Sequence, residues 1–185
     1  MIWFTADTHF GHRKIIKYAN RPFNSVKEMD EALINNWNRV VKPHDTVYHL
    51  GDFSLATNVD KYFGRLLGMI CVVPGSHDWK WTKRVRTFRS ADRSYIKVLP
   101  PLITVTVELG QRTPIVLCHY AMRIWDKSHF NSWQLFGHSH GMLKTTGKQY
   151  DVGVDNNKFY PVSILDIQKI MAMKENNRNL VRKKQ

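Results

Sequence analysis

The chain has 185 residues, 43% of them hydrophobic, and its 28 Lys and Arg exceed its 15 Asp and Glu to give a formal charge of +13. This length suffices for one domain whose core buries roughly 70% of the unfolded surface, and no run approaches the roughly 20 apolar residues of a membrane span. Residues 1–10 lack the basic segment of a signal peptide, and the positive charge favours anionic partners without selecting one.

In the first half of the chain, apolar runs at 2–6, 46–50 and 70–73 predict buried strands. A helix is expected between the first two, because Ser25 opens a Ser-Val-Lys-Glu capping box and apolar residues then recur at steps of three and four until Pro43. Shorter helices are expected at 59–67 and, more weakly, over the basic segment 82–89. Strand and helix therefore alternate in this half.

The second half is mostly strand. Runs at 102–108, 115–118, 133–136 and 150–154 predict strands, with Gly110 in a hairpin between the first two, and 163–173 predicts a closing helix. This pattern predicts the α/β class, with two sheets and helices outside them. We expect one domain over residues 1–173, followed by a frayed basic tail at 174–185.

Two further features of composition leave alternatives open. The basic stretch 80–97 and the basic tail are either solvated faces or nucleic-acid contacts, and Trp79 and Trp81 beside the first stretch favour a nucleotide or nucleic-acid substrate. Cys71 and Cys118 lie in apolar runs, which predicts reduced core thiols in the cytoplasm, with a disulfide as the alternative.

Five short clusters of Asp and His follow apolar runs, so each lies where a buried strand ends and its loop begins. They are Asp7-Thr8-His9, Gly51-Asp52, Gly75-Ser76-His77-Asp78, Cys118-His119-Tyr120 and Gly137-His138-Ser139-His140. Carboxylates and imidazoles gathered in this way are the ligands of divalent transition metals, and they suffice for two ions. Asp52 is the expected bridge, because a carboxylate has two oxygens that can each bind a cation.

In this order, the clusters resemble the five signature blocks of the calcineurin-like metallophosphoesterase superfamily. The opening residues 7–12 and the later Asn20-Arg21-Pro22-Phe23 are similar to a compact group of bacterial and phage members. The resemblance implies a four-layer α-β-β-α sandwich of two mixed β-sheets flanked by helices. It also implies two ion sites, the first held by Asp7, His9, Asp52 and His140, and the second by Asp52, Ser76, His119 and His138.

The function implied by the resemblance is that of a dinuclear metal-dependent phosphoesterase acting on phosphodiester or nucleotide phosphate bonds. Water activated between two divalent ions would attack phosphorus, His77 would act as general acid, and Asp78 would fix the orientation of that imidazole. Mixed nitrogen and oxygen ligation suits Mn, Fe, Ni or Zn, with Mn the first choice for an assay. The partner would be a phosphorylated small molecule, nucleotide or nucleic acid, in the cytoplasm or, for a phage protein, the host cytoplasm.

Other polar residues near the clusters have two interpretations each. His12 and Arg123 are candidate substrate contacts, with a structural hydrogen bond and a surface position as the respective alternatives. His49 is expected to be a buried, hydrogen-bonded residue behind the site, and Asp155 either supports a ligand or forms a turn.

Ser76 departs from the superfamily pattern, which has Asn at this position. A Ser hydroxyl is shorter and a poorer metal ligand than an amide oxygen, so we expect the second ion to bind more weakly. Ser76 is therefore a working variant, a substitution that slows the enzyme, or a sign of lost catalysis. The alternatives to an active enzyme are a catalytically impaired scaffold and a nucleic-acid-binding module on the same fold.

Overall fold

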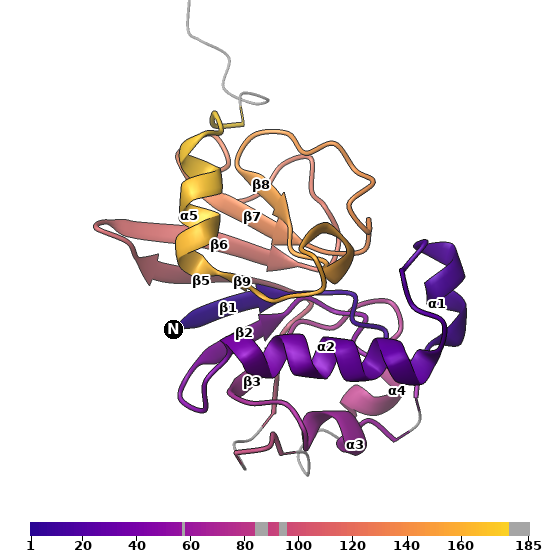
Figure 1. The fold of residues 1–185 in the computed structure, drawn as a ribbon. Coiled ribbons are helices and arrows are strands. Elements are labelled where there is room, and N and C mark those ends of the chain that lie inside the picture. Colours follow the sequence, from indigo (N-terminus) through magenta and orange to yellow (C-terminus); the bar gives the residue numbers. More distant parts are fainter. Residues whose placement is uncertain (57, 84–88, 93–95, 178–185) are drawn as a thin grey trace, which may run out of the picture.

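The computed structural model describes residues 1–56, 58–83, 89–92 and 96–177 (Figure 1). The first sheet has the strand order β4-β3-β2-β1-β9, and only β9 is antiparallel to its neighbour. Its strands are β1 (Ile2–Thr5), β2 (Thr46–His49), β3 (Met69–Val72), β4 (Lys97–Val98) and β9 (Val162–Ser163).

The second sheet has the order β5-β6-β7-β8, in which β5 is antiparallel to β6 and the other pairs are parallel. Its strands are β5 (Leu102–Glu108), β6 (Arg112–Cys118), β7 (Trp133–Phe136) and β8 (Gln149–Asp151).

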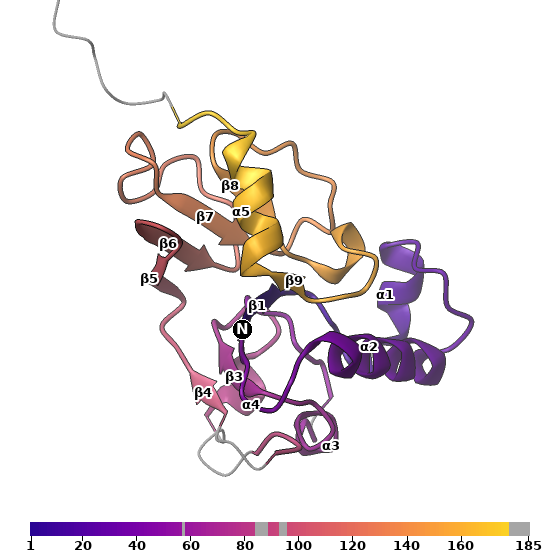
Figure 2. The same ribbon diagram turned by 60° about the vertical axis from the view of Figure 1, so that its left-hand side comes forward.

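Helices lie at both ends of the molecule. They are α1 (Arg13–Tyr18), α2 (Val26–Val40), α3 (Asp60–Phe63), α4 (Trp79–Thr82) and α5 (Ile164–Ala172), with a short 3₁₀ helix at Val154–Asn156. In both views α2 and α3 lie on the opposite side of the molecule from α5, β7 and β8 (Figures 1 and 2). The predicted α/β sandwich of two mixed sheets flanked by helices is thereby confirmed.

Helix α2 forms where the capping box predicted it. The Ser25 hydroxyl accepts the Glu28 amide at 3.1 Å, and the Glu28 carboxylate accepts the Asn24 amide at 2.8 Å. The helix ends at Val40, and Val41 continues with extended backbone two residues before Pro43. The apolar side of α2 packs with residues of β2 and β3 in a first core that includes Leu33, Trp37, Val47 and Ile70.

A second core fills the space between the two sheets. It joins Phe4 and Leu50 of the first sheet region to Ile115, Leu117 and Leu135 of the second, and α5 adds Ile164, Ile167 and Met171. On the other face of the second sheet, the buried amides of Gln134 and Gln149 hydrogen-bond to each other at 2.6 Å and to the loop 119–132 through Tyr120 and Met122. That loop therefore covers this face.

Parallel pairing aligns the strand ends that carry the polar clusters. Thr5 pairs with His49 and His49 with Val72, so β1, β2 and β3 end at one level. In the second sheet Leu117 pairs with Leu135, and a bridge between Ala6 and Gly153 joins this edge to the first sheet. The loops after these strands consequently converge.

Several short elements were not predicted. Helix α1 and strand β4 were missed, and β9 occupies the residues directly before α5. The expected basic helix at 82–89 lies largely outside the described residues, whereas α4 was not expected at Trp79–Thr82. Trp81 is buried in the first core while Trp79 is exposed, so only Trp79 remains a candidate for stacking on a substrate.

The described part of the basic tail does not fray. Asn177 is buried, donates from its side chain to the Arg123 carbonyl at 2.8 Å and from its amide to the Ser128 carbonyl at 3.0 Å. The packed chain thus extends to residue 177, and the remainder of the predicted tail lies outside the described residues. Cys71 and Cys118 are free thiols, as expected. Among the described residues, no helix is long and apolar enough to cross a membrane.

Candidate metal centre

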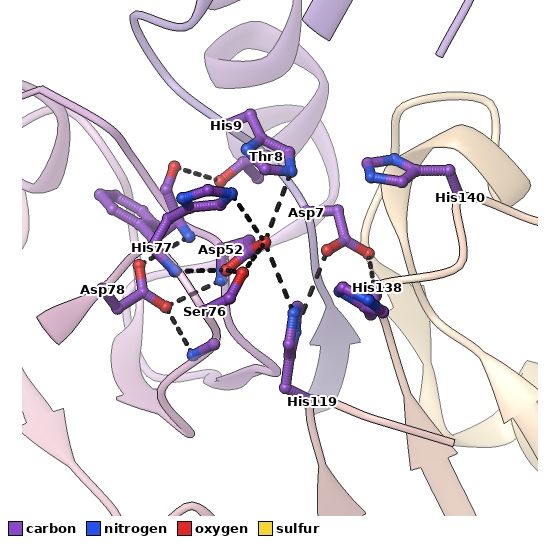
Figure 3. A network of polar contacts seen from close by, with 12 residues as sticks. Asp7, Thr8, His9, Asp52, Ser76, His77, Asp78, His119, His138 and His140 are labelled. Carbon is purple, nitrogen blue, oxygen red and sulfur yellow. Dashed lines mark hydrogen bonds and ion pairs between the residues drawn. The ribbon is translucent and has the colours of Figure 1, made fainter. Parts of the chain in front are cut away.

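The converging loops bring six of the seven predicted metal ligands together in two groups (Figure 3). Within each group, one ligand atom per residue lies within 4.8 Å of the others. The first group is Asp7, His9 and His140, and the second is Asp52, His119 and His138. The first group is the predicted first set without Asp52, and the second group is the predicted second set without Ser76.

Asp52 lies between the two groups. Its Oδ2 atom is 3.5 Å from Nε2 of His119 in the second group and 3.8 Å from Nε2 of His9 in the first. One carboxylate oxygen therefore faces both groups, which is the arrangement that a bridging ligand requires.

The ligands adopt a costly backbone conformation. Five of the six have positive φ, in the left-handed region that non-glycine residues rarely enter, at a cost of about 1–2 kcal/mol each. They are Asp7 (57°), His9 (49°), Asp52 (55°), His138 (68°) and His140 (48°). Hydrogen bonds between the loops hold them there, among them the His138 amide to Asp7 Oδ2 at 2.8 Å and the His9 amide to the Asp52 carbonyl at 3.0 Å. Strained residues of this kind cluster at functional sites.

Four buried atoms of the candidate ligands lack hydrogen-bond partners among the described residues: Asp7 Oδ1, both ring nitrogens of His9, and His119 Nε2. An unpaired buried polar group costs about 1–3 kcal/mol, so such groups are uncommon in folded proteins. Unpaired atoms in both groups fit bound cations, which would satisfy Asp7 Oδ1 and a His9 nitrogen in the first group and His119 Nε2 in the second.

Burial and neighbouring charges together set the pKa values of the candidate ligands. Burial raises the pKa of Asp7 to about 7 and lowers the pKa of His9 to about 2, so the His9 ring is neutral and keeps a free nitrogen lone pair. Burial also acts to raise the pKa of Asp52, but the neighbouring His119 and the hydrogen bond from the His77 amide outweigh it and hold that pKa below its usual range. Neutral imidazoles beside an ionised carboxylate are the protonation states that bind metals.

Two ligand imidazoles are oriented by acceptors behind them. The Nδ1 atom of His119 lies 2.7 Å from the Leu50 carbonyl, and Nδ1 of His140 lies 2.6 Å from Oδ2 of Asp155. Because a carbonyl or carboxylate can only accept, each Nδ1 carries the proton and each Nε2 is left free to coordinate. Asp155 therefore orients the ring of a predicted ligand, which agrees with one of the two interpretations given for it.

Arg21 ties this support to the first loop and was not predicted as a site residue. Its fully buried side chain donates to both carboxylate oxygens of Asp155 at 2.8 Å. It also donates to the carbonyls of Asp7 at 2.6 Å and Thr8 at 3.1 Å. In the sequence, Arg21 stood out only through the resemblance carried by Asn20-Arg21-Pro22-Phe23.

His77 lies at the mouth of the site. Its side chain is 44% exposed, its Nε2 is 3.8 Å from Asp52 Oδ2, and its amide donates to Asp52 Oδ1 at 2.9 Å. The ring is thus open to solvent beside the Asp52 carboxylate, which lies between the two groups.

The prediction that Asp78 orients the His77 imidazole is wrong. Asp78 is buried, and its carboxylate accepts the amides of Asp52 and Gly75 at 2.8 Å and of Phe53 at 3.0 Å, and the Trp81 indole at 3.1 Å. These four donors occupy the carboxylate, because the turn after β3 points Asp78 inward and His77 outward. Asp78 therefore positions the Asp52 loop.

Ser76 lies beside the shared carboxylate. Its hydroxyl donates to Asp52 Oδ1 at 3.1 Å and Oδ2 at 3.0 Å. Ser76 therefore lies next to the second group, as expected for a ligand of the second ion. Its hydroxyl, however, donates its proton to Asp52.

A cavity of about 710 Å³ opens beside both groups. His12 lines this cavity, as expected for a substrate contact. Arg123 is exposed and is not among the lining residues, so the structure does not support a substrate contact by Arg123. His49 is buried behind the site and bonds Thr8 Oγ1 at 3.0 Å, in agreement with the expectation.

Comparison with known proteins identifies relatives of the chain. No family model matches it. The Uncharacterized protein MJ1445 of Methanocaldococcus jannaschii is 32% identical over 181 residues, which cover 92% of this chain and 90% of that protein. The chain therefore belongs to the same family as MJ1445. The Gene 66 protein of Mycobacterium phage L5 is 37% identical over 73 residues, covering 40% of this chain and 34% of that protein.

A solved structure shares the fold. The protein of unknown function AQ665 from Aquifex aeolicus superimposes with a TM-score of 0.67 over 92% of this chain and 98% of its own, at 23% identity. This similarity shows that the two proteins share a fold, and it does not indicate a function.

Proposed function

We propose that this protein is a metal-dependent phosphoesterase of the calcineurin-like metallophosphoesterase superfamily, which hydrolyses phosphodiester or nucleotide phosphate bonds. The observation that carries the proposal is the pair of Asp and His groups beside one cavity, with Asp52 of the second group also facing His9 of the first. Their buried, unpaired ligand atoms support a cationic occupant.

The chain's own residues would hold and prepare the ions. Asp7, His9 and His140 would bind one divalent ion and His119 and His138 the other, with Asp52 between them. When bound, two such ions would lower the pKa of a water molecule and withdraw charge from the phosphoryl oxygens. The Leu50 carbonyl and Asp155 keep the imidazole proton on the far nitrogen of His119 and His140, so that neither ring must reorganise to coordinate.

His77 is suited to the proton transfer to the leaving oxygen. It lines the cavity, its ring is partly open to solvent, and its amide is anchored on Asp52. A histidine in this position can donate its proton to the departing group and recover it from solvent.

The nature of the metals and the location of the protein belong to the same proposal. The mixed imidazole and carboxylate set suits Mn, Fe, Ni or Zn. The two free thiols agree with a cytoplasmic location, which we propose for the chain or, for a phage protein, the host cytoplasm.

Ser76 favours a second candidate, a scaffold with impaired catalysis. Because the Ser76 proton points at Asp52, the hydroxyl competes with a second ion for that carboxylate. On this alternative the fold would keep one ion and bind phosphate without hydrolysing it.

Two measurements on one preparation separate these candidates. Metal content is determined by mass spectrometry after loading with Mn²⁺, and hydrolysis of bis(p-nitrophenyl) phosphate is measured before and after chelation. We expect Mn²⁺-dependent turnover that chelation abolishes. Two bound ions without turnover of any diester would refute the enzyme, and one bound ion without turnover would favour the scaffold.

His77→Ala tests the acid. We expect a larger loss of rate with diphenyl phosphate than with the p-nitrophenyl ester, because phenolate is the more basic leaving group and needs the proton more. His129→Ala, which removes an exposed histidine, is the matched control. Equal losses on both esters would contradict the role of His77.

A further inference from the structure

We propose that the cavity beside the metal groups binds a planar aromatic group of the substrate, so that the substrate class is small phosphodiesters carrying such a group. This inference rests on the proposed phosphoesterase function and adds the recognition of the esterified group. It follows from the unequal character of the two ends of the cavity.

One end of the cavity is the metal-binding end, formed by His9, Asp52, His77, His138 and His140. Four large apolar residues, Ile15, Tyr18, Leu55 and Met142, also line the cavity, and we call this part of the lining its apolar end. A volume of about 710 Å³ is in the range of small-molecule sites, which are mostly apolar with a few polar groups that fix orientation. A ligand with a phosphoryl group and an apolar group matches both ends.

Three of these four apolar side chains are exposed, whereas Ile15 is buried in the first core. Tyr18 is 70% exposed, Leu55 40% and Met142 89%. These residues come from three segments far apart in the sequence and meet at one cavity. Single exposed apolar residues are common, but several that gather around one hollow mark a ligand site.

A row of rings connects the two ends and favours a planar ligand. The His12 ring lies 5.4 Å from the His9 ring of the metal-binding end and 6.4 Å from the Tyr18 ring of the apolar end. Aromatic rings at such spacings pack face to edge or offset, and a third ring can join them. Met142 adds a flexible thioether, which also favours contact with aromatic rings.

The charge of the cavity favours a small diester over a long nucleic acid. Among the lining residues that the structure describes, Lys14 is the only Lys or Arg, although the chain as a whole has a charge of +13. A long polyanion is bound through several phosphate contacts. One lysine in the lining suits one phosphoryl group.

The test compares substrates that release the same product. Water adds to phosphorus while the bond to p-nitrophenolate breaks, and the retained group is p-nitrophenyl, thymidine or methyl. The measured quantity is the ratio of kcat/KM for an aromatic diester to that for methyl p-nitrophenyl phosphate. Comparing ratios between variants cancels differences in intrinsic reactivity, and the thymidine ester shows whether a nucleobase or a simple aryl group is preferred.

We expect Tyr18→Ala and Met142→Ala each to lower this ratio about three- to tenfold, which is the fold-change that corresponds to the free energy of one aromatic contact. Phe130→Ala and Met173→Ala are matched controls, because these residues are 75% and 81% exposed and do not line the cavity. An unchanged ratio in both cavity variants, with turnover intact, would overturn the aromatic site alone. Absence of turnover of every ester by the Mn²⁺-loaded protein would overturn the phosphoesterase and this inference together.

Discussion

The substitution Asp155→Asn tests whether the buried pair with Arg21 holds the metal centre in place. Asp155 accepts three hydrogen bonds, two from Arg21 and one from His140. Asn has one acceptor oxygen, and its NH₂ group would face an Arg21 donor. Removing one partner of a buried ion pair costs about 3–5 kcal/mol because the other charge is left uncompensated. Since Asn keeps the shape and one acceptor, we expect about 3 kcal/mol, or a fall in Tm of roughly 6–12 °C for a chain of this size.

The same substitution removes the carboxylate that fixes His140. Loss of such a partner lowers metal affinity about 10- to 100-fold. Thermal unfolding in EDTA measures the first effect without interference from metal, and calorimetric titration with Mn²⁺ measures the second.

An exposed pair of the same geometry provides the control. Arg65 donates to both oxygens of Glu31 at 2.7 and 2.6 Å, and the two side chains are 45% and 42% exposed. We expect Glu31→Gln to cost less than about 1 kcal/mol and to leave Mn²⁺ affinity unchanged. The reasoning is refuted if Asp155→Asn costs no more than Glu31→Gln and binds Mn²⁺ equally well.

Three further predictions concern single residues. Ser76→Asn should increase Mn²⁺ occupancy and the rate at limiting Mn²⁺, because a longer amide reaches a second ion; unchanged occupancy and rate would contradict this. Gly51→Ala should destabilise the protein by several kcal/mol more than Gly110→Ala in denaturant titrations, because a Cβ on Gly51 would lie 2.5 Å from Gly75 Cα, whereas one on Gly110 meets nothing within 4 Å at a similar positive φ. Burial lowers the pKa of His49 from 6.5 to about 3, so between these values only the unfolded chain binds the proton, and stability falls as the pH falls. His49→Gln should therefore lose less free energy of unfolding than the wild type on acidification from pH 7 to about pH 4.5 in EDTA, by at most about 3 kcal/mol, and equal losses would count against this effect.

The grouping of the candidate ligands could be predicted from the sequence because their placement depends on strand ends. Parallel neighbours finish at one edge of a sheet, so residues such as Asp7 and Asp52, which come two and three residues after β1 and β2, are brought together by the pairing itself. The capping box at Ser25 was equally local, since donor and acceptor are three residues apart. Expectations of this kind need only the order of the elements and the hydrogen bonds within them.

The supporting residues depend on contacts that sequence order does not reveal. Arg21 and Asp155 are 134 residues apart, and nothing in the spacing of either residue points to the other. The role of Asp78 was mispredicted because it was inferred from its sequence neighbour His77, whose side chain points the other way from the turn. Four donors that contact Asp78 determine its role instead. The two-residue strand β9 is defined only by its pairing with β1.

The measurement that tests the central claim most directly is anomalous diffraction from crystals grown with Mn²⁺. We predict two peaks that share Asp52, one also bound by Asp7, His9 and His140 and the other by His119 and His138. A single peak, or peaks away from these side chains, would contradict the two-ion centre on which the proposed function depends.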